Sequence, residues 1–138
     1  MMIVIDQNKI KEWFCENIEN YKINDKQILF RFPFLLDSDD TLSIYITINK
    51  DSIQLSDGGL ILDLLFKNQG ILQENFNKAQ RNFIEYICDN YNINYQEEQE
   101  QFIMKTTQEE LIEDMTYFIQ ALIQLNLLDM FSETEEDK

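Results

Sequence analysis

Residues 42–65 read LSIYITINKDSIQLSDGGLILDLL, and this stretch decides the fold class. Apolar and polar side chains alternate over residues 42–48 and again over 53–55, with the period of half-buried β-strands. After the turn at 57–59, apolar residues recur at helical spacing instead. The stretch therefore predicts two antiparallel strands, a tight turn and a helix in direct succession.

The turn contains two of the chain's three glycines, Gly58 and Gly59, side by side. Glycine adopts positive φ at little cost and lets backbones approach closely, so the turn is under a steric demand. Asp57 is placed to cap the following helix, with its carboxylate facing unpaired N–H groups. We predict a structural turn of Asp57, Gly58 and Gly59, and favour it over an exposed nucleophile or metal ligand at Asp57.

The remaining elements follow from the same periodicities. Helical spacing predicts helices over about residues 6–20, 75–90 and 107–128, and alternation predicts a strand over 28–35. Two short strands are predicted around 93–95 and 102–104, and residues 21–26 are predicted to be a connection. The result is an α+β fold: an antiparallel three-stranded meander, which the two short strands can extend, packed against three to four helices. We expect one domain over residues 1–131 and an acidic disordered tail over 132–138.

The chain is strongly acidic, with 26 Asp and Glu residues against 11 Lys and Arg and a formal charge of -15. Such a surface repels phosphate backbones and anionic lipids, so we expect neither direct nucleic-acid binding nor membrane binding. Cys15 and Cys88 lie among apolar residues at helical positions, which predicts buried free thiols in a reducing compartment. Without a signal-peptide pattern or a long apolar segment, we expect a cytoplasmic protein.

Catalytic chemistry finds little support in the sequence. The chain contains no histidine, which is the most frequent general base and the commonest transition-metal ligand. It also lacks a glycine-rich phosphate loop and a zinc-binding cysteine pattern. We therefore predict no catalytic residue, cofactor or metal site, and keep a metal-dependent enzyme using Asp57 and Asp63 as an alternative.

Two surfaces are predicted to contact other macromolecules. The last helix is apolar around most of its circumference. This pattern is typical of helices that lie in the centre of a core or pack against a second subunit. A homodimer interface is accordingly predicted at Phe118, Leu122, Leu125 and Leu128. An acidic contact surface is predicted at Asp37, Asp39, Asp40, Glu97, Glu98 and Glu100.

The motif Ser56-Asp57-Gly58-Gly59 between a short strand and a helix, together with the run ALIQLNLLD at residues 121–129, resembles a known family. This is the uncharacterised phage and bacterial family catalogued as domain of unknown function 1828, and the resemblance covers most of residues 25–130. It implies no catalytic residues. The element order is also similar to that of class I secretion chaperones, which are acidic and dimerise; this is an analogy of fold and does not assign a function.

Together these features predict a non-catalytic protein–protein interaction module. The family resemblance and the charge suggest a phage or mobile-element protein that inhibits a host defence or nucleic-acid-binding effector by occupying its basic surface. The expected partner is a protein with a basic surface, and the chain itself is expected to form a homodimer. A chaperone-like or antitoxin-like partner that protects a client protein is the second reading, and the metal-dependent enzyme is the third.

Overall fold

The computed structural model describes residues 2–36 and 40–131, and it has the predicted α+β architecture. The helices are α1 (Gln7–Glu16), α2 (Leu60–Gln69), α3 (Lys78–Tyr91) and α4 (Leu111–Leu125), with short 3-10 helices η2 (Gln73–Asn75) and η3 (Leu128–Met130). The strands are β1 (Glu19–Asn24), β2 (Gln27–Leu35), β3 (Thr41–Asn49), β4 (Ser52–Ser56), β5 (Asn94–Gln96) and β6 (Gln101–Thr106). Acidic residues 132–138, predicted as a tail, lie outside the described residues.

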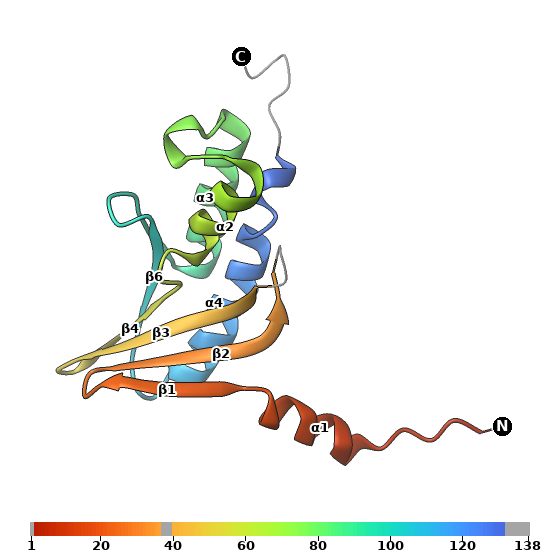
Figure 1. The fold of residues 1–138 in the computed structure, drawn as a ribbon. Coiled ribbons are helices and arrows are strands. Elements are labelled where there is room, and N and C mark those ends of the chain that lie inside the picture. The colour runs from red at the N-terminus through yellow and green to blue at the C-terminus, as the bar shows by residue number, and fades with distance from the viewer. Residues whose placement is uncertain (1, 37–39, 132–138) are drawn as a thin grey trace.

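The strands form one antiparallel sheet in the order β1-β2-β3-β4-β6-β5 (Figure 1). The predicted meander is confirmed as β2, β3 and β4, with Ile46 of β3 opposite Leu55 of β4. The two predicted short strands are present as the β5–β6 hairpin, and β6 pairs with β4. Because β6 joins the meander directly, the turn that ends β4 lies next to the β5–β6 hairpin.

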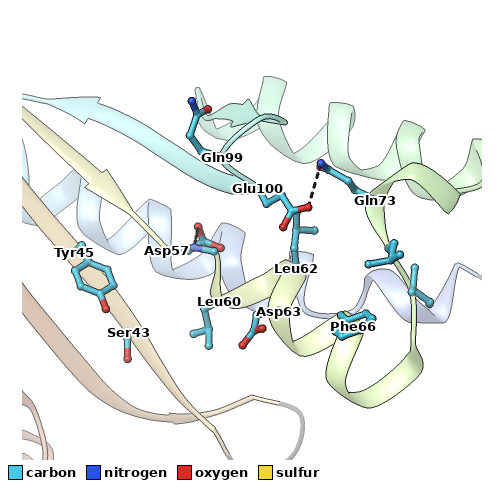
Figure 2. A pocket seen from close by; sticks show the side chains of 14 residues that line it. Ser43, Tyr45, Asp57, Leu60, Leu62, Asp63, Phe66, Gln73, Gln99 and Glu100 are labelled. Atoms are coloured by element: carbon cyan, nitrogen blue, oxygen red, sulfur yellow. Dashed lines mark hydrogen bonds between the residues drawn. The ribbon is translucent and has the colours of Figure 1, made fainter.

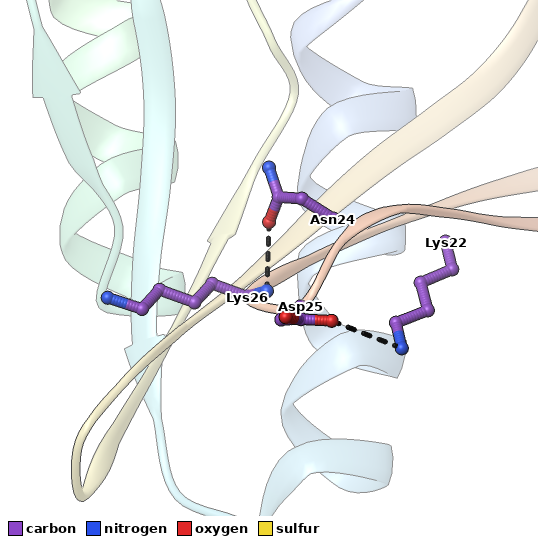
Figure 3. Close-up of polar contacts among 4 residues, drawn as sticks. All are labelled: Lys22, Asn24, Asp25 and Lys26. Atoms are coloured by element: carbon purple, nitrogen blue, oxygen red, sulfur yellow. Dashed lines mark hydrogen bonds and ion pairs between the residues drawn. The ribbon is translucent and has the colours of Figure 1, made fainter.

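Residues 21–26 were predicted to be a connection, and that prediction is wrong. Most of this segment belongs to the edge strand β1, which pairs with β2 and is exposed along its whole length. A strand with no buried face has no alternating pattern, so periodicity could not reveal it. The β1–β2 turn is held by local contacts: the Asn24 side chain accepts from the Lys26 N–H at 2.8 Å, and Lys22 pairs with Asp25 at 3.5 Å (Figure 3).

The core lies between one face of the sheet and the helices α2, α3 and α4. β3 and β4 contribute Leu42, Ile44, Ile46 and Leu55. α4 packs across β4 and β6, and α3 packs against α4. α2 ends at Gln69, where Gly70 caps the helix in a left-handed conformation with φ of 67°.

The interface predicted on the last helix needs correction. Phe118, Leu122, Leu125 and Leu128 are all fully buried within a single chain. They contact the core and offer no surface to a partner unless the fold opens. A helix that is apolar on several sides lies either in a core or against a second subunit, and the structure places these four residues in the core. The homodimer itself stays a prediction.

The first helix is shorter than the predicted 6–20, and the last helix, predicted over 107–128, covers Leu111–Leu125. The first helix also differs in its surroundings. It begins at Gln7, and the carboxylate of the N-cap residue Asp6 accepts from the N–H groups of Asn8 and Lys9 at 3.1 and 3.2 Å. It ends at Glu16 because β1 follows, and none of its residues is buried. Cys15 is exposed, which contradicts its predicted burial, whereas Cys88 is half-buried; both are free thiols.

Among the described residues, no helix is long and apolar enough to cross a membrane.

The two cysteines should therefore differ in reactivity. Burial, with a further contribution from Asp89, raises the pKa of the Cys88 thiol to about 11. At pH 8 only about one Cys88 in a thousand is then the nucleophilic thiolate. We expect iodoacetamide to label Cys15 in the native protein and Cys88 only after unfolding in urea, as read by peptide mass spectrometry. Equal labelling rates in the native protein would contradict this assignment.

Candidate functional site

The end of β4 is held by the carboxylate of Asp57, which is 1% exposed. Its Oδ1 accepts from the backbone N–H of Gly59 at 3.0 Å and of Phe102 at 2.9 Å, and its Oδ2 accepts from the N–H of Ile61 at 3.2 Å. The Asp57 N–H in turn donates to the Phe102 carbonyl at 3.2 Å. One side chain thus connects β4, the first turn of α2 and β6.

This arrangement agrees with the predicted capping role of Asp57. The N-cap position itself is Gly59, but the carboxylate two residues earlier satisfies the Ile61 N–H, one of the otherwise unpaired donors of α2. Burial raises the pKa of Asp57, and the backbone N–H donors from Phe102, Gly59 and Ile61 oppose that shift. Since both carboxylate oxygens accept hydrogen bonds from the backbone, the group is structural.

Gly58 and Gly59 adopt positive φ, 62° and 83°, as the sequence led us to expect. Their surroundings differ. A Cβ on Gly58 would lie 2.8 Å from Cδ2 of Tyr45 and closer still to Cε2, whereas a Cβ on Gly59 would meet the Glu100 carbonyl at 3.4 Å. Gly58 is thus required both by its backbone conformation and by the ring that packs over it.

The proposed metal chemistry at Asp57 and Asp63 lacks an assembled site. Asp63, on the first turn of α2, pairs with Lys67 at 3.0 Å and is about half exposed. Over residues 2–36 and 40–131, no three His, Cys, Asp or Glu side chains are grouped so as to hold a metal ion. The two aspartates border the same pocket (Figure 2), but Asp57 uses its oxygens for the backbone.

Two pockets flank the β5–β6 turn. The first, the turn pocket, has a volume of about 480 Å³ and is bordered by Tyr45, Gly58, Leu62, Asp63, Phe66 and Glu100 (Figure 2). The second, the α3 pocket, has a volume of about 620 Å³ and is bordered by Phe76, Ile84, Glu85, Cys88, Asp89 and Tyr95, with Gln73, Glu74, Arg81 and Glu97. The α3 pocket thus draws on one face of α3, on the η2 segment and on β5.

Gln73 lies between the two pockets and borders both. Its Nε2 donates to the Glu97 carbonyl at 2.8 Å and to Oε1 of Glu100 at 3.4 Å, and its Oε1 accepts from the Tyr95 hydroxyl. The contact with Glu100 is drawn in Figure 2. These bonds tie η2 to the β5–β6 hairpin, so the wall between the pockets is built from two segments that are distant in sequence.

The α3 pocket combines an apolar floor with an acidic rim. Phe76 and Ile84 form the buried part of the floor, and Cys88 and Tyr95 are half-buried. Four exposed carboxylates surround it, from Glu74, Glu85, Asp89 and Glu97. The cation at the pocket, Arg81, donates to the backbone carbonyl of Phe76. Burial and the nearby Glu97 and Glu100 raise the pKa of Tyr95 to about 12, so its hydroxyl remains neutral.

The structure brings together part of the predicted acidic surface. Glu97, Glu98 and Glu100 are exposed in the β5–β6 turn beside the pockets. Asp40 is exposed just before β3, and with Asp63, the larger influence, it raises the pKa of Lys67 on α2. Asp37 and Asp39 lie outside the described residues.

The sequence reasoning missed Glu74, Glu85 and Asp89 as members of this surface. Glu85 and Asp89 are four residues apart and therefore share a helix face, which was a usable signal. Sequence spacing could not show that this face is opposite Glu74 and Glu97.

The comparisons with known proteins place most of this architecture in one family. The model of a family described as "Domain of unknown function DUF1828" matches residues 32–125. This range contains the turn at 57–59 and the residues of both pockets, and excludes α1 and β1. No curated protein and no solved structure matches the chain.

Proposed function

The chain belongs to the DUF1828 family, whose description assigns no activity, and from its geometry we propose a non-catalytic module that binds a basic surface of another protein. The observation that carries the proposal is the α3 pocket, with its apolar floor and its rim of four carboxylates. Lysine and arginine side chains have the complementary form: an apolar stem that packs on hydrophobic surface and a charged head. A basic side chain of a partner would place its stem over Ile84 and Cys88 and its head beside Glu85 and Asp89.

The charge of the whole chain supports the same function. A formal charge of -15 attracts a basic partner over a distance and increases the rate at which the two meet. Carboxylates pair with the same guanidinium and ammonium groups that hold phosphates in nucleic-acid-binding proteins. A partner bound through such groups would be unable to contact nucleic acid with them.

The more specific form of the proposal is inhibition. In this form the chain is a cytoplasmic protein of a phage or mobile element, and it inactivates a host defence or nucleic-acid-binding effector by occupying its basic surface. This form rests on the charge and on the resemblance to a family of phage and bacterial proteins. Chemistry at Asp57 is not needed for it, because occupying a surface requires no bond to be made or broken.

The proposal predicts that basic peptides bind at the α3 pocket. We expect an oligoarginine peptide to bind the wild-type chain in calorimetric titrations at low salt and to bind more weakly as salt rises. The double variant Glu85→Lys, Asp89→Lys should weaken binding about tenfold or more, because two attractive contacts become repulsive.

The matched control carries the same change of charge on exposed residues away from the pocket, Asp51→Lys with Glu109→Lys. This control should reduce binding much less, through the overall charge alone. Equal losses in the two double variants would show that the peptide responds to net charge, and the α3 pocket would then have no role as a specific site.

A further inference from the structure

The N-terminal arm, residues 2–16, is the part of the described chain in which most large apolar side chains are exposed to solvent. α1 buries none of its residues. Figure 1 shows the arm extending beyond the sheet, away from α2, α3 and α4. Ile10, Trp13 and Phe14 are 52%, 51% and 43% exposed, and they lie along one stripe of the helix. Aromatic side chains held out in this way are typical anchors of protein interfaces.

The arm also differs in charge from the rest of the chain. Residues 2–16 hold two lysines, Lys9 and Lys11, and three acidic residues, Asp6, Glu12 and Glu16, so the arm is nearly neutral, whereas the rest of the chain carries a formal charge of -14. Lys9 and Lys11 each lie about 100° around the helix from Ile10, in opposite directions, so they flank the apolar stripe on both sides. The arm thus presents an apolar centre between two cations, and the α3 pocket presents an apolar floor within a ring of carboxylates.

The arm does not contact the α3 pocket of its own chain. It leaves from β1 at one edge of the sheet, and the pocket lies beside β5 at the other edge. Neighbouring strands are about 4.8 Å apart, so the two edges are separated by about 24 Å. Because α1 also points outward from the β1 edge, a complementary contact must come from another molecule.

We infer that the N-terminal arm of one copy of this chain binds the α3 pocket of a second copy. Trp13 or Phe14 packs on the floor formed by Ile84, Cys88 and Tyr95, and the flanking lysines pair with Glu85 and Asp89. The pocket volume of about 620 Å³ is within the roughly 300–1,000 Å³ that holds a group of this size. The inference rests on the proposed function for its pocket, and it names a second copy of the chain as the occupant.

A charge-exchange experiment on the full chain tests this inference. Light scattering should give the wild type a mass above the 16.6 kDa of one chain, increasing with protein concentration. The arm variant Lys9→Glu, Lys11→Glu and the pocket variant Glu85→Lys, Asp89→Lys should each raise the dissociation constant about tenfold or more. Trp13→Ala should weaken association as well, and circular dichroism should show all the variants folded.

Mixing the two charge variants provides the decisive result. In the mixture the acidic arm of one variant meets the basic pocket of the other, and the unchanged arm meets the unchanged pocket, so association should return to the wild-type level. A wild type of 16.6 kDa at every concentration, or a mixture that stays dissociated, would overturn the inference. If the oligoarginine peptide still bound at the α3 pocket in that case, the proposed function would stand and only the second copy would be excluded as occupant.

Discussion

Replacing Asp57 with alanine is expected to lower the free energy of unfolding by about 3 to 5 kcal/mol. The substitution removes the acceptor for the N–H groups of Gly59, Ile61 and Phe102 at once. Because the site is buried, water cannot replace the lost carboxylate without opening the structure. Urea unfolding followed by circular dichroism at neutral pH would measure the change.

Two further substitutions separate this role from a general effect of losing a charge. Asp57→Asn keeps Oδ1 as an acceptor but directs an amide N–H₂ at the Ile61 donor, so we expect an intermediate loss. Asp63→Ala, on an exposed ion pair in the same pocket, should change stability by no more than about 0.5 kcal/mol. If Asp57→Ala cost no more than Asp63→Ala, the buried carboxylate would not be what holds the turn together.

Replacing Gly58 with alanine is expected to cost about 2 to 4 kcal/mol. Part of this loss comes from the backbone, because φ of 62° disfavours any residue with a Cβ. The rest comes from overlap with the ring of Tyr45, which β3 holds against the turn. Thermal and urea unfolding should both report the loss.

Gly59→Ala is the matched control for the second contribution. Its φ is similarly positive, but its nearest neighbour is the Glu100 carbonyl at an ordinary 3.4 Å, so a cost of about 1 to 2 kcal/mol is expected. Adding Tyr45→Ala to Gly58→Ala should recover part of the loss relative to the sum of the single variants. Equal costs at Gly58 and Gly59, with no recovery, would show that the ring contact contributes nothing.

Asp57 has a structural role and is distinct from the exposed carboxylates around the α3 pocket. An aspartate in a glycine-containing turn beside a pocket resembles a catalytic group, but its hydrogen bonds to three backbone N–H groups and its burial account for it structurally. The carboxylates of the α3 pocket, by contrast, lie on exposed positions of η2, α3 and the β5–β6 turn. In the proposed function, recognition therefore takes place at these exposed carboxylates, while Asp57 stabilises the turn.

The parts of the fold that were predictable are those with a strong local period. The meander, α2 and α3 each have one side buried in the core, and burial of one side produces a regular repeat of apolar residues in the sequence. β1 was missed because it has no buried side. The burial of Cys15 was predicted wrongly because an amphipathic helix looks the same in sequence whether or not its apolar stripe is covered.

By itself the sequence determined the α+β class, the antiparallel meander, the positive φ angles at the two glycines and the acidic character of the surface, since each depends on neighbouring residues or on composition. Only the tertiary structure decided that α4 lies in the core, that Asp57 connects β6 to α2, and that Glu74, Glu85, Asp89 and Glu97 surround one pocket. Those facts depend on which segments meet after folding. Asp57 and Phe102, for example, are 45 positions apart in the sequence, and a contact over this separation cannot be read from the periodicity of neighbouring residues.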